Sequence, residues 1–334
     1  QDPDGGVKIV TNELQANYGD VLGEMGWVSA SRDSNQVGEW VRPIARAILY
    51  FRNIKGQEAY IRKLHQACFA AADFIVRNGT DRVGDRGHVL RHYQYPPYTP
   101  NAPQPIKRTL YHQEGRQCEV YVGRAMAGVS YVAYARAVCG LPVPAEWLTA
   151  LRETTAWAAE RMAPRQGWFD WGCEDVVEGG CHTFLGNQYI AEGTMGHYLL
   201  ERTLGHKEEA AAAAAATKLA LRYVTDHCVI RGRKFGIPTE FWVGPYLYWQ
   251  LREYNTYLEP DPVFAAWMQG ITDAYVKTGK WQGFTDRSRD TVGRGLDNGS
   301  LVTSILAWLG LHYQDEIGKP WTGYESMGTG RGGR

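Results

Sequence analysis

Apolar residues recur at a helical spacing over most of the chain, and the strict alternation that marks strands is almost absent. Gly140 and Gly205 fall between apolar runs, and Asn78-Gly79 follows another, so these positions are expected to end helices. The spacing predicts helices at about 37–52, 56–77, 118–138, 145–162, 186–203, 206–227, 241–256, 262–278 and 299–313.

These predicted helices are of two kinds, and the two kinds alternate along the chain. One kind is crowded with small and aromatic residues on every side, which is typical of buried helices. It comprises the stretches that begin near 119, 187, 241 and 298. The other kind, at 56–77, 145–162 and 206–227, carries an apolar stripe and a charged face, as outer helices do. A buried helix, a short turn, an amphipathic helix and a long loop thus form a unit of roughly 60 residues.

Long connections run from each outer helix to the next buried helix, so they should gather at one end of the buried helices. Such long loops in a compact domain are usually functional. The loops are expected at about 79–117, 164–185, 229–240 and 279–298.

This arrangement resembles the (α/α)-toroid carbohydrate enzymes, which include the six-hairpin glycosidases and the helical-barrel polysaccharide lyases. The resemblance covers about 34–313 in architecture, and no family motif is intact. It implies an all-α fold, an (α/α) toroid of about five to six helical hairpins. We expect a single catalytic domain over 1–334, with short irregular tails at 1–10 and 318–334.

The composition narrows the choice of ligand. Lys plus Arg and Asp plus Glu both number 36, so the chain lacks the basic excess of a nucleic-acid-binding protein. No stretch reaches the ~20 apolar residues of a membrane span. The 12 Trp and 20 Tyr outnumber the 9 Phe, which favours wet surfaces and sugar rings over a purely apolar core. We therefore expect an oligosaccharide or polysaccharide as partner, with no nucleic acid and no membrane.

The cysteines and the start of the chain point to an oxidising compartment. The sequence opens without Met, as a processed or trimmed chain does. Cys173 and Cys181 share a short polar segment with glycines that let it fold back, so a local disulfide is plausible. A secreted or periplasmic location follows from these features as an expectation. The cysteines expected to be buried thiols are Cys68, Cys139 and Cys228.

The loop at 79–117 is rich in basic, His and Tyr residues. It holds six Lys or Arg against three Asp or Glu. Arg guanidinium groups bind carboxylates through two parallel hydrogen bonds, which suits an acidic sugar such as a uronate. A solvated surface loop is the plainer alternative.

The loop at 164–185 offers aromatic platforms in Trp168 and Trp171, together with carboxylates. Two carboxylates far enough apart to admit a water would support inverting glycoside hydrolysis. Unsaturated-uronyl hydrolases of the six-hairpin group have a similar Trp- and Asp-containing loop, and 293–299 is loosely similar to their later Arg-Gly-Asn-Gly stretch. The carboxylates of this alternative are Asp170, Glu174 and Asp175, with Glu240 and Asp297 as further candidates.

The segment that opens the helix at 186–203 resembles alginate-lyase-type enzymes. Those enzymes carry an Asn-His pair at this kind of place and a Tyr near the next inner helix. Asn187 matches the Asn, but Gln188 stands in place of the His, so His182 or His112 would have to substitute. Tyr246 is the candidate for the Tyr.

Lyase chemistry removes the proton α to a uronate carboxylate, so that carboxylate's charge must be neutralised. A base and an acid for the leaving oxygen are also required. Structural roles for the same residue types, such as satisfying buried backbone groups, remain the alternative. The predicted catalytic residues are Asn187, Tyr246, His182, His112 and Arg116. The predicted substrate-binding residues are Arg91, His92, Tyr93, Tyr111, Trp168, Trp171, Trp242 and Arg294.

Metal and cofactor signals are weak. His88 and His92 are four residues apart and could share a helix face, but no HExxH-like Glu lies between them. No phosphate-binding or dinucleotide-binding glycine motif is present, so no metal and no cofactor is predicted.

The leading hypothesis is a polysaccharide lyase that cleaves a uronate-containing glycan by β-elimination. A six-hairpin-type glycoside hydrolase is the first alternative. A toroid cyclase or dehydratase for a small apolar molecule is less favoured, because its pocket would have to desolvate many Arg and His side chains. A non-catalytic binding protein is the last alternative.

Overall fold

A computed structural model describes part of this chain. For some residues in the strands β5 to β7 and at the starts of two helices (183–185 and 243–249), it describes the backbone alone. The described residues are 1–7, 32–95, 98, 100, 109–110, 112–113, 116–117, 121–169, 183–226 and 243–266.

Helices dominate this part of the chain, which confirms the all-α class. The α4–α5 turn ends in Pro144, whose fixed φ suits the residue before a helix, and α5 has the predicted bounds. Gly140 and Gly205 adopt positive φ at the ends of α4 and α6, as expected for helix stops. The helices are α2 (Ser34–Phe51), α3 (Glu58–Gly79), α4 (Val122–Val138), α5 (Ala145–Met162), α6 (Thr183–Leu204), α7 (Lys207–Tyr223) and α8 (Val243–Tyr257), with a short 3₁₀ turn at Ala163–Arg165.

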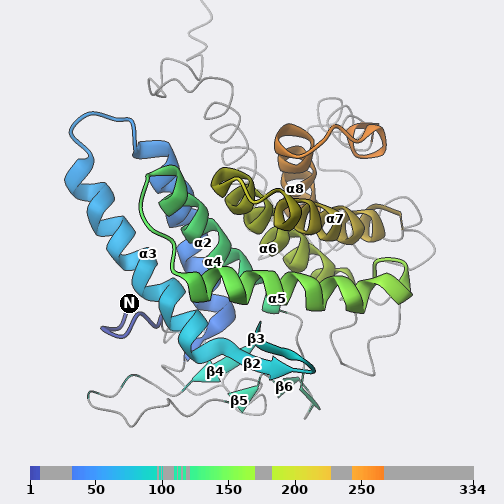
Figure 1. The fold of residues 1–334 in the computed structure, drawn as a ribbon, viewed down its shortest axis with the longest axis horizontal. Coiled ribbons are helices and arrows are strands. Elements are labelled where there is room, and N and C mark those ends of the chain that lie inside the picture. Colours follow the sequence, from blue (N-terminus) through green and yellow to red (C-terminus); the bar gives the residue numbers. More distant parts are fainter. Residues whose placement is uncertain are drawn as a thin grey trace, which may run out of the picture.

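The helices α2, α4, α6 and α8 form an inner layer in which each contacts the next (Figure 1). Glycines allow these helices to approach closely, because a Cβ at Gly128 would collide with Gly38, and one at Gly123 would collide with the backbone of Tyr189. Residues further along one helix contact residues further along the next, as Gly123 does with Tyr189 and Gly196 with Ser130. The neighbouring inner helices therefore run parallel. The predicted crowding of small residues in the buried helices therefore serves close helix packing.

The helices α3, α5 and α7 form the outer layer and return antiparallel to their inner partners. Each packs on the inner helix that precedes it, and α5 also contacts α3 and α7. The rings of Phe69 on α3 and Trp147 on α5 lie 5.1 Å apart between centroids. The predicted alternation of buried and outer helices is confirmed over this part of the chain.

The stretch predicted as the loop 79–117 contains short antiparallel strands, which the sequence pattern did not predict. These strands have two to five residues each, too few to establish a period in the sequence. They gather at the end of the inner helices where α2 begins (Figure 1). The pairs are β1 (Arg32–Asp33) with β4 (Tyr93–Tyr95), β4 with β5 (Thr109–Leu110), β2 (Thr80–Val83) with β3 (Arg86–Leu90), and β6 (His112–Gln113) with β7 (Arg116–Gln117).

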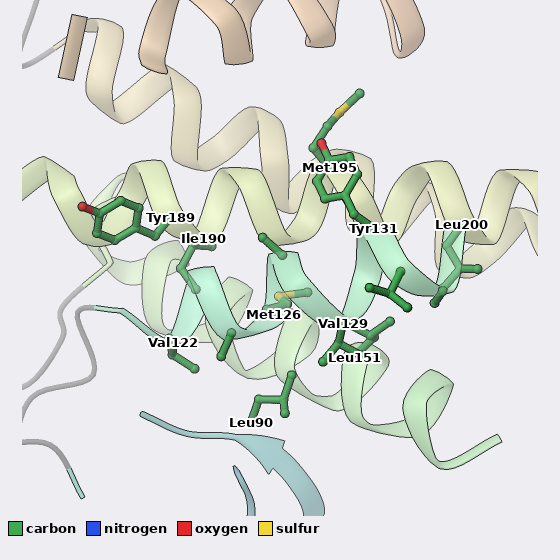
Figure 2. Close-up of a cluster of buried hydrophobic side chains, with 14 of the residues drawn as sticks. Leu90, Val122, Met126, Val129, Tyr131, Leu151, Tyr189, Ile190, Met195 and Leu200 are labelled. Carbon is green, nitrogen blue, oxygen red and sulfur yellow. The ribbon is translucent and has the colours of Figure 1, made fainter. Parts of the chain in front are cut away.

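The core is centred on α4, whose side chains are buried on nearly every side (Figure 2). Met126 and Val129 lie between α6, represented by Ile190 and Leu200, and the outer helix α5 with Leu151 (Figure 2). Burial of each such side chain contributes about 1.5–3 kcal/mol to stability. The inner helices are thus held by apolar packing, and charged groups among them require specific partners.

The prediction of a buried thiol is confirmed for Cys68 and only partly met at Cys139. Cys68 is a fully buried free thiol, and burial raises its pKa to about 12. Cys139 is a free thiol that is half-buried. Cys173, Cys181 and Cys228 lie outside the described residues. Among the described helices, none combines the length and the apolar character needed to cross a membrane.

Candidate functional site

A buried Asp–His pair lies where α2 begins. Asp33 is the N-cap of α2, and its Oδ1 accepts hydrogen bonds from the backbone N–H of Asn35 (2.6 Å) and Gln36 (3.3 Å). Its other oxygen, Oδ2, lies 2.9 Å from Nε2 of His92. Both side chains are buried. A carboxylate held in this way fixes the orientation of the imidazole, as the orienting residue of a catalytic base does.

Aromatic rings continue from His92 across the starts of α4 and α6. The ring of Tyr121, which precedes α4 and is half-buried, meets the His92 ring edge-on at 5.3 Å between centroids. Tyr189 on α6 lies 5.4 Å from Tyr121. The Arg124 guanidinium lies 4.0 Å from the Tyr189 ring centroid and 5.5 Å from that of Tyr121. These cation–π contacts hold the guanidinium against both rings.

Arg124 also forms an ion pair with Glu39 of α2, at 2.8 Å between Nη1 and Oε2. The side chains of Arg124 and Glu39 are 14% and 29% exposed, so both side chains are partly accessible to solvent. The mouth cluster is defined here as Asp33, His92, Tyr121, Arg124, Tyr189 and Glu39. It combines a cation, two carboxylates, an imidazole and two phenol groups near the starts of three inner helices.

A second pair of charges lies one helical turn deeper. Arg42 of α2 and Glu192 of α6 form a buried ion pair. Each lies three residues, about one turn, after a member of the mouth cluster on its own helix, Glu39 and Tyr189 respectively. Only one carboxylate oxygen of Glu192 is used in this pair. Its Oε1 is buried and makes no hydrogen bond with the part of the chain that the structure describes. This oxygen can accept a hydrogen bond from a ligand or a water.

A third group of charges lies deeper again and joins α2, α4 and α8. Tyr131 donates a hydrogen bond of 2.7 Å to Oε1 of Glu253, and Arg46 lies 3.5 Å from Oε2 of the same carboxylate. The guanidinium of Arg46 is 4.3 Å from the Tyr131 ring centroid. Burial raises the pKa of Glu253, and it also raises the pKa of Tyr131. Buried charges of this kind persist only with partners, and these partners tie the inner helices together.

Asn187, the predicted carboxylate-neutralising residue, binds backbone groups in this structure. Its Oδ1 accepts from the backbone N–H of Phe169 (2.9 Å), and its Nδ2 donates to the carbonyls of Gly167 (2.6 Å) and Ala220 (3.4 Å). The amide is fully buried. Asn187 of α6 therefore links the segment that follows α5 to α7 through backbone hydrogen bonds. This is the structural role that the sequence analysis gave as the alternative.

The predicted substrate-binding residues on the strands separate in space. His92 joins the mouth cluster, whereas Tyr93 is buried and its hydroxyl donates to Asp81. The backbone N–H of Arg91 donates to the carbonyl of Gly79 at 2.7 Å. Trp168 is half-buried beside the Arg165 guanidinium, at 5.9 Å.

The remaining predicted residues are described in part or not at all. Residues His112, Arg116 and Tyr246 are described by their backbone alone, with His112 and Arg116 in the paired strands β6 and β7. The predicted residues that lie outside the described part are Tyr111, Asp170, Trp171, Glu174, Asp175, His182, Glu240, Trp242, Arg294 and Asp297.

The proposed sharing of a helix face by His88 and His92 is wrong, because His88 lies in the strand β3 and His92 precedes β4. His88 is exposed and lies near Glu153 of α5, at 3.6 Å. Within the described ranges, no group of three or more His, Cys, Asp or Glu side chains is placed to hold a metal ion.

Sequence reasoning missed Asp33, Glu39, Tyr121, Arg124 and Glu192. A signal for two of them existed, because Arg124 and Glu192 are charged residues inside otherwise apolar helices, where an unpaired charge would be costly. Asp33 also precedes α2 as a favoured N-cap residue would.

Comparisons with protein families, with curated proteins and with solved structures gave no match to this chain.

Proposed function

We propose that this chain is a secreted or periplasmic (α/α)-toroid enzyme that cleaves a uronate-containing glycan by β-elimination. The parallel inner helices with antiparallel outer helices support this proposal, because a toroid arranges such hairpins around a common axis. The mouth cluster is the proposed active site, since it lies near the starts of α2, α4 and α6, the end at which the long loops are expected from the sequence.

One observation carries the proposal: Arg124 is held against Tyr121 and Tyr189, with the His92–Asp33 pair directly behind Tyr121. β-Elimination needs a cation for the uronate carboxylate and proton-transfer groups beside it. In this proposal Arg124 binds the carboxylate bidentately, exchanging part of its contact with Glu39. The hydroxyl of the half-buried Tyr121 would face the sugar.

The reaction removes the proton at C5, forms the C4–C5 double bond and breaks the bond from C4 to the glycosidic oxygen. Tyr121 as phenolate takes the C5 proton, and the leaving oxygen receives a proton from Tyr121 or from water. The cation of Arg124 stabilises the negative charge that develops on the carboxylate. His92, oriented by Asp33, positions the Tyr121 ring. The second oxygen of Glu192, which is buried one turn below and has no hydrogen-bond partner in the described part of the chain, would accept a hydrogen bond from a sugar hydroxyl that enters the site.

The test follows ultraviolet absorbance of the new double bond during incubation with uronate polysaccharides. Tyr121→Phe should lower turnover at least about 100-fold, the usual contribution of a proton-transfer group. Tyr60→Phe is the matched control, since Tyr60 is an exposed tyrosine of the outer helix α3. Full turnover in Tyr121→Phe would remove Tyr121 from the mechanism.

A glycoside hydrolase is the second candidate, and the exposure of Glu39 favours it. Glu39 is a carboxylate at the mouth beside Arg124, and a carboxylate there could act as acid or base. In that case reducing ends would form without any rise in absorbance. Glu39→Gln would then abolish activity, whereas a lyase that uses Tyr121 would retain turnover in that variant.

A further inference from the structure

At the end of α4 opposite the mouth cluster lies an arginine that has no carboxylate partner among the described residues. Arg136 is in the last turn of α4, and its Nε donates to the carbonyl of Pro142 at 2.9 Å. Its guanidinium is 4.6 Å from the ring centroid of Phe69 on α3. Among the described residues, Arg136 has no ion pair and its terminal amino groups have no hydrogen bond. Stacking and one hydrogen bond hold this guanidinium in place, and its terminal amino groups can still bind an oxyanion through two parallel hydrogen bonds.

A buried histidine lies beside this arginine. His65 is four residues before Phe69, so both side chains project from the same face of α3. It is only 8% exposed, and neither ring nitrogen has a hydrogen-bond partner in the described part of the chain. Burial lowers the pKa of His65, and the nearby charge of Arg136 lowers it further. A neutral imidazole still has one N–H to donate, and leaving it unsatisfied costs about 1–3 kcal/mol.

The neighbouring groups add further N–H donors. Trp147 on α5 packs on Phe69, and its indole N–H is buried without a hydrogen-bond partner among the described residues. Arg52 at the C-cap of α2 is close enough to Cys139 for its charge to act on that thiol. The described part of this surface thus brings together cations and N–H donors.

We propose that Arg136 and His65 form a binding site for an oxyanion, the phosphate, sulfate or carboxylate group of a ligand. The guanidinium of Arg136 would hold two oxygens, with Phe69 as its platform. The His65 N–H would donate to one of them and gain the partner that it lacks. This site is separate from the mouth cluster, because the two lie at opposite ends of α4.

The experiment titrates the full chain with inorganic phosphate and follows the ring resonances of His65 by nuclear magnetic resonance. Phosphate should shift these resonances saturably and raise the pKa of His65, because a bound anion favours the protonated ring. Arg136→Gln should weaken phosphate binding at least about tenfold. A parallel titration with glucuronate distinguishes a carboxylate ligand from a phosphate ligand.

Arg82→Gln is the matched control, since Arg82 is an exposed arginine whose Nε likewise bonds to one backbone carbonyl, that of Gly84. It should leave the titration unchanged. The proposal would be overturned if sodium chloride at equal ionic strength gave the same shift as both anions. It would also be overturned if Arg136→Gln bound both anions as the original chain does. The wild-type titration decides the matter even if the Arg136 variant does not fold, and it requires no enzymatic activity.

Discussion

Glu201 offers a quantitative test of how charges stabilise this helical array. Its carboxylate is fully buried near the end of α6. Oε1 lies 2.7 Å from Nε of Arg152 and 3.1 Å from Nε2 of His197, and Oε2 lies 2.6 Å from Nδ1 of His206. Burial alone would raise the pKa of Glu201, but the hydrogen bonds from these three partners outweigh burial and lower it to about 2.

The pKa shift sets the size of the effect. A lowering from 4.5 to about 2 corresponds to about 3.4 kcal/mol at roughly 1.36 kcal/mol per unit. Arg152 and His206 are 35% and 41% exposed, so solvent screens part of this energy. Glu201→Gln, which removes the charge and keeps the shape, should therefore lower the free energy of unfolding by about 2 kcal/mol at pH 7.

The dependence on pH has a defined sign. Because the folded-state pKa of Glu201 lies below the unfolded value, its stabilisation is complete above about pH 5 and is lost as the pH falls from about 4.5 to about 2. Denaturant unfolding of the original chain and of Glu201→Gln should thus differ most near neutral pH and converge in acid. Glu209→Gln is the control, since Glu209 is a partly exposed, more distant partner of Arg152. A stability difference that is independent of pH, or no larger than that of the control, would refute this reasoning.

Three further predictions follow from the packing. Gly123→Ala should destabilise the fold by about 3 kcal/mol or more, because the added Cβ would collide with the Tyr189 backbone. Gly87→Ala is the control: Gly87 has open space around it, so the denaturation midpoint should change little. Asn187→Ala should cost about 2–4 kcal/mol in the same assay by leaving buried backbone groups unsatisfied, and an unchanged midpoint would contradict its bracing role. Cys68, with its pKa raised to about 12, should resist alkylation at pH 8 until the protein unfolds, as mass spectrometry of the labelled peptide can establish.

The helices of the described part could largely be predicted from the sequence. Their apolar periodicity is long enough to be distinguished from chance, and Gly140 and Gly205 mark ends that the backbone confirms. The strands between α3 and α4 could not be predicted in this way. Their pairing depends on contacts such as that of Arg32 with Tyr95, which are distant in sequence and have no local period.

The candidate site was harder to predict for the same reason. Of the predicted residues that the structure describes with their side chains, only His92 belongs to the mouth cluster. Glu192 and Arg42 are 150 residues apart in sequence, and their pairing follows from the parallel approach of α2, α4 and α6. A charged residue in an apolar helix indicates that a partner is needed, but a single sequence does not identify the partner.

The central claim is that the mouth cluster carries out β-elimination on a uronate glycan. The most direct measurement follows absorbance near the ultraviolet edge and reducing ends together, for the original chain and for Tyr121→Phe, with a panel of uronate polysaccharides. The account predicts that absorbance rises in step with reducing ends, and that both signals fall at least about 100-fold in Tyr121→Phe. Reducing ends without absorbance, or equal activity in the two proteins, would contradict it.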